Sequence, residues 1–309
     1  MKEIINYYYN LDCLEIDESK NYSTFNSFGN TFYFVFFNRT SEELTDLVQI
    51  IQELIQRGVK THIIVQNKFG EYLTKVGEHN YVMLKLNSNI NEEISIIDIN
   101  EKNELLRLNQ INSKLYRNNW AELWSSKVDY FENQIRELGK DKDIILNSFS
   151  YYIGLAENAI SYVNKINKVI GLDKTENITL SHRRIFYPNI SLNYYNPLSY
   201  IFDIEVRDIA EYLKSCFFGG NSALGDLDVI LKTKKFSNYS YHMMYARLLY
   251  PTYYFDIYEG IINDNIEEEK LIPIINKVNE YEDFLKKAYQ LISKYTSLER
   301  VDWLLTKEL

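Results

Sequence analysis

The chain contains few cysteines, prolines and glycines. Its 309 residues include two cysteines, four prolines and 11 glycines. Two cysteines that lie far apart in sequence, Cys13 and Cys216, argue against a disulfide scaffold and favour a reducing, intracellular compartment. The four histidines lack the spacing of a structural zinc site. The first residues carry no apolar segment typical of a signal peptide, and no apolar run approaches the roughly 18 residues of a membrane span. We therefore expect neither segment.

Basic residues are outnumbered by acidic ones. The chain has 43 Asp and Glu against 34 Lys and Arg, which gives a formal net charge of −9. We expect no binding to nucleic acid or to anionic membranes, because both require a basic surface. Apolar residues, at 46%, suffice for a sizeable core. The 27 tyrosines and 16 phenylalanines reflect either a compositional bias or an interaction surface rich in aromatic side chains.

Patterns in residues 1–86 predict a small antiparallel sheet with one helix. Two aromatic and β-branched runs, at 22–27 and 31–37, flank the hairpin signal Phe28-Gly29-Asn30. Thr40 and Glu43 have the spacing of a capping box, and apolar residues then recur at helical spacing as far as Gly58. Further strands are predicted at 62–66, 71–76 (a short one) and 81–86. The predicted order is β-β-α-β-β.

Beyond about residue 98 the pattern changes to long helices. They are predicted at 101–138 (with a break), 144–170, 206–218, 239–250 and 267–305, around a strand-like island at 185–202. The fold class predicted is α+β, a two-lobed outline like that of protein kinases. Its N-lobe spans 1–86, the interlobe connection 87–100, and the helical C-lobe with an inserted hairpin 101–309.

The segment around His182 carries the chemistry. It resembles the catalytic loop H-G-D-x-x-x-x-N of the aminoglycoside phosphotransferase and choline kinase group, with His182 and Asn189 at the His and Asn positions. Arg183 replaces the Gly and Arg184 replaces the Asp. That Asp orients the substrate hydroxyl and accepts its proton in phosphoryl transfer. A guanidinium keeps its protons and accepts no hydrogen bond, so Arg184 cannot act as the base.

Other parts of a phosphotransfer site are incomplete. Asp203 follows an apolar run and stands where the family places its metal-binding Asp, so Asn189 and Asp203 are residual candidate ligands for Mg²⁺. The competing explanation is that Asp203 ends a strand and caps the next turn. The strand at 31–37 lacks the lysine that would pair with phosphates and a helix glutamate, and Glu53 is then expected to face water. The Phe28-Gly29-Asn30 turn, with one glycine, offers few backbone N–H groups to a phosphate.

Four further segments resemble bacterial spore-coat kinase-like proteins, namely the YutH group, related to CotS. They are WAELWSSKVDYFENQI at 120–135, YYIGLAENAI at 151–160, RDIAEY at 207–212 and YARLLYP at 245–251. The resemblance spans roughly residues 20 to 260. It implies a choline-kinase-like fold of two lobes and a role in endospore formation, with synthesis in the mother cell cytoplasm and a final location in the spore coat.

Residues in these segments also have structural explanations. Trp120 and Trp124 share one helix face and are expected in the core. Asp208 opens a helix, where its carboxylate would cap N–H groups, and Arg207 would bridge to the hairpin. Arg247 lies on an apolar helix and is expected to form a buried ion pair with Asp208 or Glu157. We assign structural roles to Arg207, Asp208 and Arg247.

The sequence therefore predicts a catalytically degenerate kinase-like protein that acts by binding. No catalytic residue is assigned, because the loop with His182, Arg184 and Asn189 is degenerate. No cofactor is expected, and other spore-coat proteins are the expected partners. The alternatives are an active or residual small-molecule phosphotransferase and a nucleotide-sensing pseudokinase. Only these alternatives require ATP and Mg²⁺.

Overall fold

The chain folds into two compact units. The computed structural model describes residues 1–18, 22–87, 94–105, 107–108, 113–117, 119–139, 141–171, 177–185, 194–263 and 266–306. The smaller unit, unit 1, comprises residues 1–93, 112–116 and 189–200, and the larger, unit 2, comprises 94–111, 117–188 and 201–309. Each unit is described by itself. Among the described helices, none is both long and apolar enough to span a membrane.

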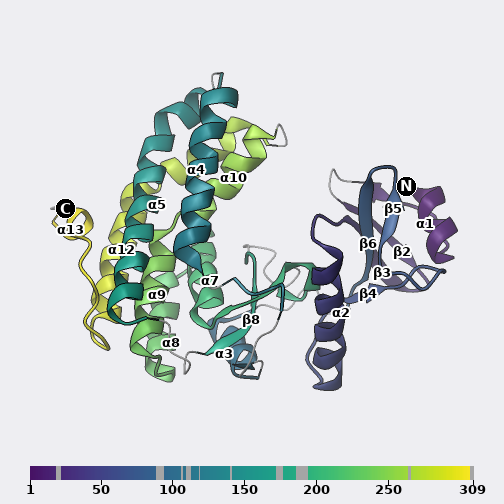
Figure 1. Ribbon diagram of the computed structural model, residues 1–309, viewed down its shortest axis with the longest axis horizontal. Helices are drawn as coiled ribbons and strands as arrows, with labels where there is room; N and C mark the ends of the chain where they lie inside the picture. The colour runs from purple at the N-terminus through teal and green to yellow at the C-terminus, as the bar shows by residue number, and fades with distance from the viewer. Residues whose placement is uncertain are drawn as a thin grey trace. The chain divides into compact units, whose positions relative to one another are not determined.

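Unit 1 is an antiparallel sheet with a helix on either side (Figure 1). The strands follow the order β1-β2-β3-β6-β4, and β5 pairs with β6. Their bounds are β1 Asp17–Glu18, β2 Tyr22–Ser27, β3 Asn30–Phe36, β4 Ile63–Val65, β5 Thr74–Val76 and β6 His79–Lys85. Helix α1 spans Lys2–Tyr9, and α2 spans Ser41–Gln56. All the strands predicted from periodicity are present, whereas α1 and β1 were not predicted.

Local sequence signals explain the two features that shape unit 1. In the β2–β3 hairpin Ser27 pairs with Asn30, so the loop consists of Phe28 and Gly29, both at positive φ as a type I′ turn requires. At the start of α2, the Thr40 side chain accepts from the Glu43 N–H and the Glu43 carboxylate accepts from the Thr40 N–H. Both predictions, the hairpin and the capping box, are confirmed.

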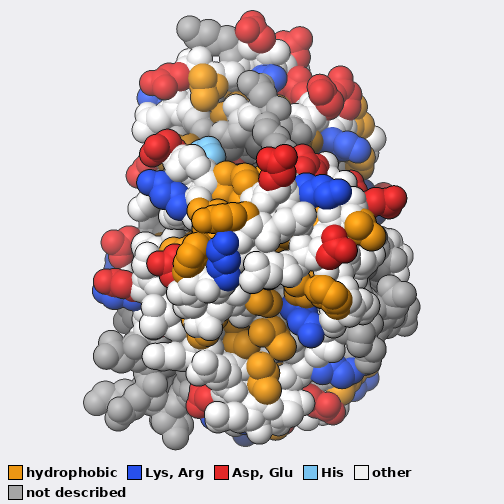
Figure 2. Space-filling view, turned by 90° about the vertical axis from the view of Figure 1, so that its right-hand side faces the viewer, with side chains coloured by type: hydrophobic (Ala, Val, Ile, Leu, Met, Phe, Trp, Pro, Cys, Tyr) orange, Lys and Arg blue, Asp and Glu red, His pale blue; other side chains and the backbone are white. Residues whose placement is uncertain are grey.

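Both faces of the unit 1 sheet are covered. Ile5, Tyr9 and Cys13 pack with Phe34 and Met83 on one face. Helix α2 lies on the other side of the sheet (Figure 1). Its apolar residues recur at helical spacing and are buried: Leu44, Leu47, Ile51 and Leu54. Large apolar side chains nevertheless reach the surface and are scattered among polar ones (Figure 2). In unit 1 they include Tyr7, Leu14, Tyr22, Phe28, Phe36 and Phe69.

Unit 2 is a bundle of helices that also holds a small three-stranded sheet (Figure 1). The helices are α3 Ile96–Leu105, α4 Trp120–Leu138, α5 Asp143–Val169, α7 Val206–Phe218, α8 Ala223–Thr233, α9 Asn238–Leu249, α10 Thr252–Ile262, α11 Ile272–Ile275, α12 Val278–Ile292 and α13 Asp302–Leu305. The strands β7 Arg107–Leu108, β8 Ile178–His182 and β9 Tyr200–Ile204 lie in the order β7-β8-β9. Helix α9 packs against α5, α7 and α12, so it lies at the centre of the bundle.

Some of the predicted helices of unit 2 differ from the observed ones. The break predicted within 101–138 is confirmed, because this region holds the two helices α3 and α4, but α3 begins earlier, at Ile96. The helix predicted over 267–305 is divided into α11, α12 and α13. Two helices, α8 and α10, were not predicted. The predicted island at 185–202 is bounded by β8 and β9, and its residues 186–193 lie outside the described residues. At least 13 of the 27 tyrosines are buried, which explains much of their number as core packing.

Candidate functional site

Strand β8 ends at His182, which is completely buried. The carboxylate of Asp208, in the first turn of α7, contacts both the backbone and the ring of His182. One carboxylate oxygen accepts from the His182 backbone N–H at 2.8 Å, and the other lies 2.6 Å from the ring Nδ1. The ring Nε2 lies 3.3 Å from the Lys102 ammonium of α3. This pairing fits a neutral imidazole that donates from Nδ1 to Asp208 and accepts at Nε2. Burial lowers the pKa of Lys102 to about 7, although Asp208 opposes the effect.

Arg184, at the position of the catalytic base, is held in an ion pair. Its Nε donates to Asp256 of α10 at 2.6 Å and its Nη2 donates to the same carboxylate at 2.9 Å. Its Nη1 donates to the carbonyl of Arg183 at 2.7 Å. Burial lowers the pKa of Arg184, but Asp256 and Glu211 outweigh it and the net shift is upward. The side chain is therefore a fixed cation with no capacity to accept a proton.

The Asp203 carboxylate, at the end of β9, is fully buried and already bonded. One oxygen accepts from the Trp120 indole at 3.0 Å and from the Ile204 N–H at 2.8 Å. The other accepts from the same indole at 2.9 Å and from Arg207 at 2.5 Å. Burial raises the pKa of Asp203, and Arg207 opposes this. Four hydrogen bonds from this chain thus engage the two oxygens that would have to bind Mg²⁺.

Asn189, the other predicted metal ligand, lies outside the described residues, so its pairing with Asp203 stays a prediction. Among the described residues, no group of three or more His, Cys, Asp or Glu side chains could hold a metal ion. Arg207, besides binding Asp203, donates to the carbonyls of His182 and Arg183 at 2.8 and 3.2 Å. It thereby fixes the backbone that leads from β8 to Arg184.

Arg247 of α9 forms its ion pair with Glu211 of α7, with Nε 2.7 Å from the carboxylate. Its partner is therefore neither Asp208 nor Glu157, the two that the sequence suggested. Lys214 also donates to Glu211, at 2.9 Å, and to Thr252 at 2.6 Å. Burial raises the pKa of Glu211, but Lys214 and Arg247 outweigh it and lower the pKa below its usual range. Burial lowers the pKa of Lys214 to about 7, although Glu211 opposes it.

Aromatic rings complete this buried network. The Arg247 guanidinium lies 5.0 Å from the ring centre of Trp120 and 5.6 Å from that of Trp124. Trp124 stacks on Tyr250 with ring centres 4.2 Å apart. Both tryptophans are buried, as predicted. Three of the four sequence segments that suggested the spore-coat resemblance thus meet at one place, together with the segment around His182.

Unit 1 has no lysine on β3. The next basic residue in the sequence is Arg39, which is buried. It pairs with Glu43 at 3.2 Å and donates to the carbonyls of Leu198 and Tyr200, both at 3.0 Å and both in unit 1. Glu53 is 61% exposed and pairs with Arg57, so it faces water as predicted. The described part of unit 1 therefore offers no lysine–glutamate pair for nucleotide phosphates between β3 and α2.

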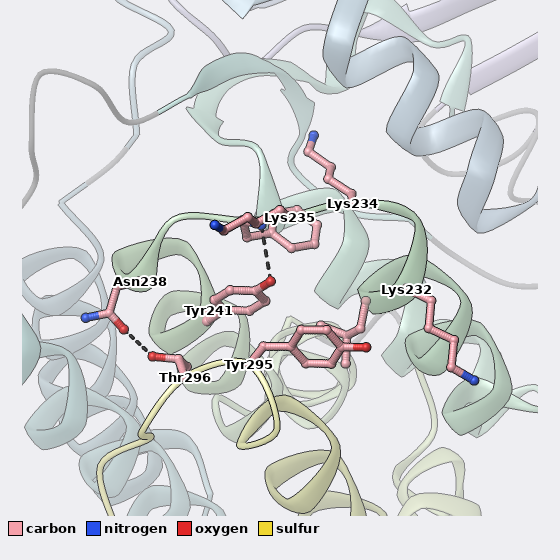
Figure 3. A pocket seen from close by; sticks show the side chains of 9 residues that line it. Lys232, Lys234, Lys235, Asn238, Tyr241, Tyr295 and Thr296 are labelled. Atoms are coloured by element: carbon pink, nitrogen blue, oxygen red, sulfur yellow. Dashed lines mark hydrogen bonds between the residues drawn. The ribbon is translucent and has the colours of Figure 1, made fainter.

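Two cavities among the described residues of unit 2 are lined by ionisable side chains. One, of about 430 Å³, contains the stacked rings of Tyr241 and Tyr295, whose centres are 5.9 Å apart (Figure 3). Two of its lysines are already paired, Lys232 with Asp228 and Lys234 with Glu205. The other, of about 340 Å³, is bordered by Arg184 and Asp256, and we call it the Arg184 cavity. Of these two cavities, the Arg184 cavity is the one that adjoins the described residues after β8.

We expect Glu211→Gln to destabilise unit 2 strongly. The substitution preserves the shape of the side chain but leaves the buried Arg247 and Lys214 without their counter-charge. Loss of one partner of a buried ion pair costs about 3–5 kcal/mol. Urea unfolding followed by circular dichroism measures the change, and the exposed Glu53→Gln serves as control, with no measurable shift expected. A loss below about 1 kcal/mol would show that the two cations do not depend on Glu211.

We expect Lys102→Met to flatten the pH dependence of stability above pH 7. The folded-state pKa of Lys102 is about 7, below its ordinary value of 10.5. Between pH 7 and 9 the unfolded chain therefore binds more protons at Lys102, and stability rises with pH by up to about 1.4 kcal/mol per unit. Lys214 has the same effect in parent and variant. Urea midpoints at pH 7.5, 8.25 and 9 test this, with the exposed Lys165→Met as charge control. Parallel curves for parent and Lys102→Met would refute it.

Comparison with known sequences identifies the family of the chain. The family model "Spore coat putative kinase YutH" matches residues 2–288. The endospore coat-associated protein YutH of Bacillus subtilis (strain 168) is 27% identical over 209 residues, 60% of this chain. The chain spans about three fifths (61%) of the length of that curated relative.

Solved structures with a similar fold include phosphotransferases. An aminoglycoside phosphotransferase from Alicyclobacillus acidocaldarius aligns with a TM-score of 0.61 at 10% identity, over 95% of this chain and 97% of that one. Choline kinase LicA from Streptococcus pneumoniae aligns with a TM-score of 0.51 at 11% identity, over 95% and 98%. The predicted fold, two-lobed and like that of aminoglycoside phosphotransferases, is confirmed. By its family match, the chain belongs to the YutH family of spore-coat kinase-like proteins.

Proposed function

We propose that this protein is a catalytically degenerate member of its fold class and acts by binding, as a component or assembly factor of the spore coat. The observation that carries the proposal is the ion pair of Arg184 with Asp256, at 2.6 and 2.9 Å. It puts a fixed cation where phosphoryl transfer needs a proton acceptor. The bonded state of Asp203 supports the same conclusion, because its oxygens already accept from Trp120, Arg207 and Ile204.

A role in binding is supported by the surface of unit 1. Tyr7 and Phe69 are 57% and 59% exposed and lie beside Tyr8, with ring centres 5.1 to 6.4 Å apart. The Lys68 ammonium lies 3.4 Å from the Tyr7 ring centre. Exposed aromatic side chains of this kind are enriched where proteins bind one another. The family and the name of the B. subtilis relative support the coat as the location.

We expect no phosphoryl transfer from ATP to small hydroxylated compounds. Loss of a general base costs on the order of 10²–10⁴ in rate, and the missing lysine on β3 adds to that loss. Because β3 lacks that lysine, the dissociation constant of ATP·Mg²⁺ should exceed about 1 mM. Coupled ADP-release assays and thermal-shift titrations measure both. Metal-dependent turnover that Asp203→Asn abolishes would overturn the proposal, and saturable stabilisation at micromolar ATP would favour a nucleotide sensor.

The coat role can be tested separately from chemistry. In an endospore-forming host that lacks its own copy, we expect a fluorescent fusion of this chain to reach the coat, and Asp203→Asn to do so equally well. Asn keeps the shape of Asp203 and an oxygen that accepts from Trp120 and Arg207, but it removes the counter-charge of Arg207, so a loss of stability is expected. The purified variant must first show the far-UV spectrum of the parent. A folded Asp203→Asn that fails to reach the coat would contradict a role by binding alone, as would a parent fusion that stays diffuse.

A further inference from the structure

The Arg184 cavity has the composition of a small-molecule site. Its volume of about 340 Å³ lies at the lower end of the range for ligand pockets. The walls come from the segment after β8 and from α7, α10 and α11. Most of the lining is apolar, and the side chains that matter here are Ile185, Phe218, Tyr253, Ile257 and Ile274. Arg184 and Asp256 stand out against these walls as charged groups that remain partly exposed, at 29% and 23%.

Arg184 retains donors that no described residue uses. A guanidinium has five N–H groups in a planar fork. Three are engaged, two with Asp256 and one with the carbonyl of Arg183. Two N–H groups therefore remain, on a side chain that Asp256 holds in place at two points. A planar fork fixed in this way matches the oxygens of a carboxylate or a phosphate.

The other charged groups of the cavity are already satisfied. The Lys214 ammonium donates to Glu211 and Thr252 and contacts the carbonyls of Arg247 and Tyr250 at 3.1 and 3.3 Å. Glu211 in turn accepts from Lys214 and Arg247. Both side chains are buried, at 2% and 4% exposure. Recognition of a charged ligand in this cavity therefore falls to Arg184.

We propose that the Arg184 cavity binds a small organic anion, a carboxylate or phosphate monoester with a compact apolar body. The charged group docks on the two remaining N–H groups of Arg184, and the apolar body lies against Phe218, Tyr253 and Ile274. The inference rests on the proposed function only in that the ligand is bound and not phosphorylated. Anion binding is therefore measured without nucleotide, and its failure is separate from any result on ATP turnover.

The test uses four probes of nearly equal size on the full chain, with affinity measured by ligand-observed NMR and calorimetry. They are phenylacetate, phenyl phosphate, the neutral phenylacetamide and the cationic 2-phenylethylamine. We expect one or both anions to bind at least about tenfold more tightly than the amide, since hydrogen bonds to a charged group supply a gain of that size. The carboxylate and phosphate arms decide which anion the cavity prefers. The amine is not expected to bind.

Variants separate recognition from stability. Arg184→Gln should weaken anion binding by about tenfold or more, and Ile257→Trp, which fills the cavity, should abolish it for every probe. Asp256→Asn should tighten anion binding by about threefold or more, because it removes a negative charge that repels the bound anion, while the Asn oxygen can still accept from Arg184. A purely structural ion pair would give the opposite result for Asp256→Asn. This variant also keeps the test decisive if Arg184→Gln does not fold.

Several results would overturn the inference. They are equal affinity for phenylacetate, phenyl phosphate and phenylacetamide, preferential binding of 2-phenylethylamine, and anion binding that persists unchanged in Ile257→Trp. Weaker anion binding by a folded Asp256→Asn would also overturn it. No detectable binding of either anion to the parent at millimolar concentration would do the same.

Discussion

Charge compensation in a buried environment is the constraint on which the centre of unit 2 depends. Glu211, Arg247 and Lys214 are all at most 4% exposed, and an uncompensated ion at such depth costs several kcal/mol. Each must therefore lie within bonding distance of an opposite charge, which fixes the spacing of α7 and α9. The same requirement applies to Asp203 with Arg207. Helix α7 carries Arg207, Asp208, Glu211 and Lys214, and all four are buried because α7 is enclosed by α3, α8, α9 and β8.

This network accounts for segments that a functional reading of the sequence leaves unexplained. The tryptophans of α4 lie beside Arg247, and Trp120 also donates to Asp203, so one ring links two ion pairs. Asp208 binds the backbone and ring of His182 and thereby fixes the end of β8. Positions that serve catalysis in phosphotransferases of this fold are here parts of a packed ionic core. Packing and charge compensation alone thus suffice to explain why these residues stand where they do in the motifs.

Features that depend on neighbours in sequence could be predicted, and those that depend on distant ones could not. The capping box of Thr40 and Glu43 spans three residues, and α7 was predicted over its full length from its periodicity. Helix α10 was missed because its sequence, TYYFDIYEGII, is apolar on most sides and shows little alternation. The counter-ion of Arg184 lies on that helix, 72 residues away, and Trp120 lies 83 residues from Asp203. No local spacing predicts such pairs. The ion pair of Arg247 was therefore predicted correctly, but the predicted partners, Asp208 and Glu157, were wrong.

The replacement of an acid by Arg184 is not an isolated substitution, because Asp256 depends on it. In the observed pair the two charges cancel across a distance of 2.6 Å. Restoring only the acid, as in Arg184→Asp, would set two carboxylates on one wall of the same cavity. Like charges at short range cannot both ionise readily, so one of them would retain its proton to higher pH. The pKa of the restored acid would therefore depend on the charge at Asp256. The charges at positions 184 and 256 are therefore coupled, and a carboxylate at 184 would ionise at its ordinary pKa only beside a neutral side chain at 256.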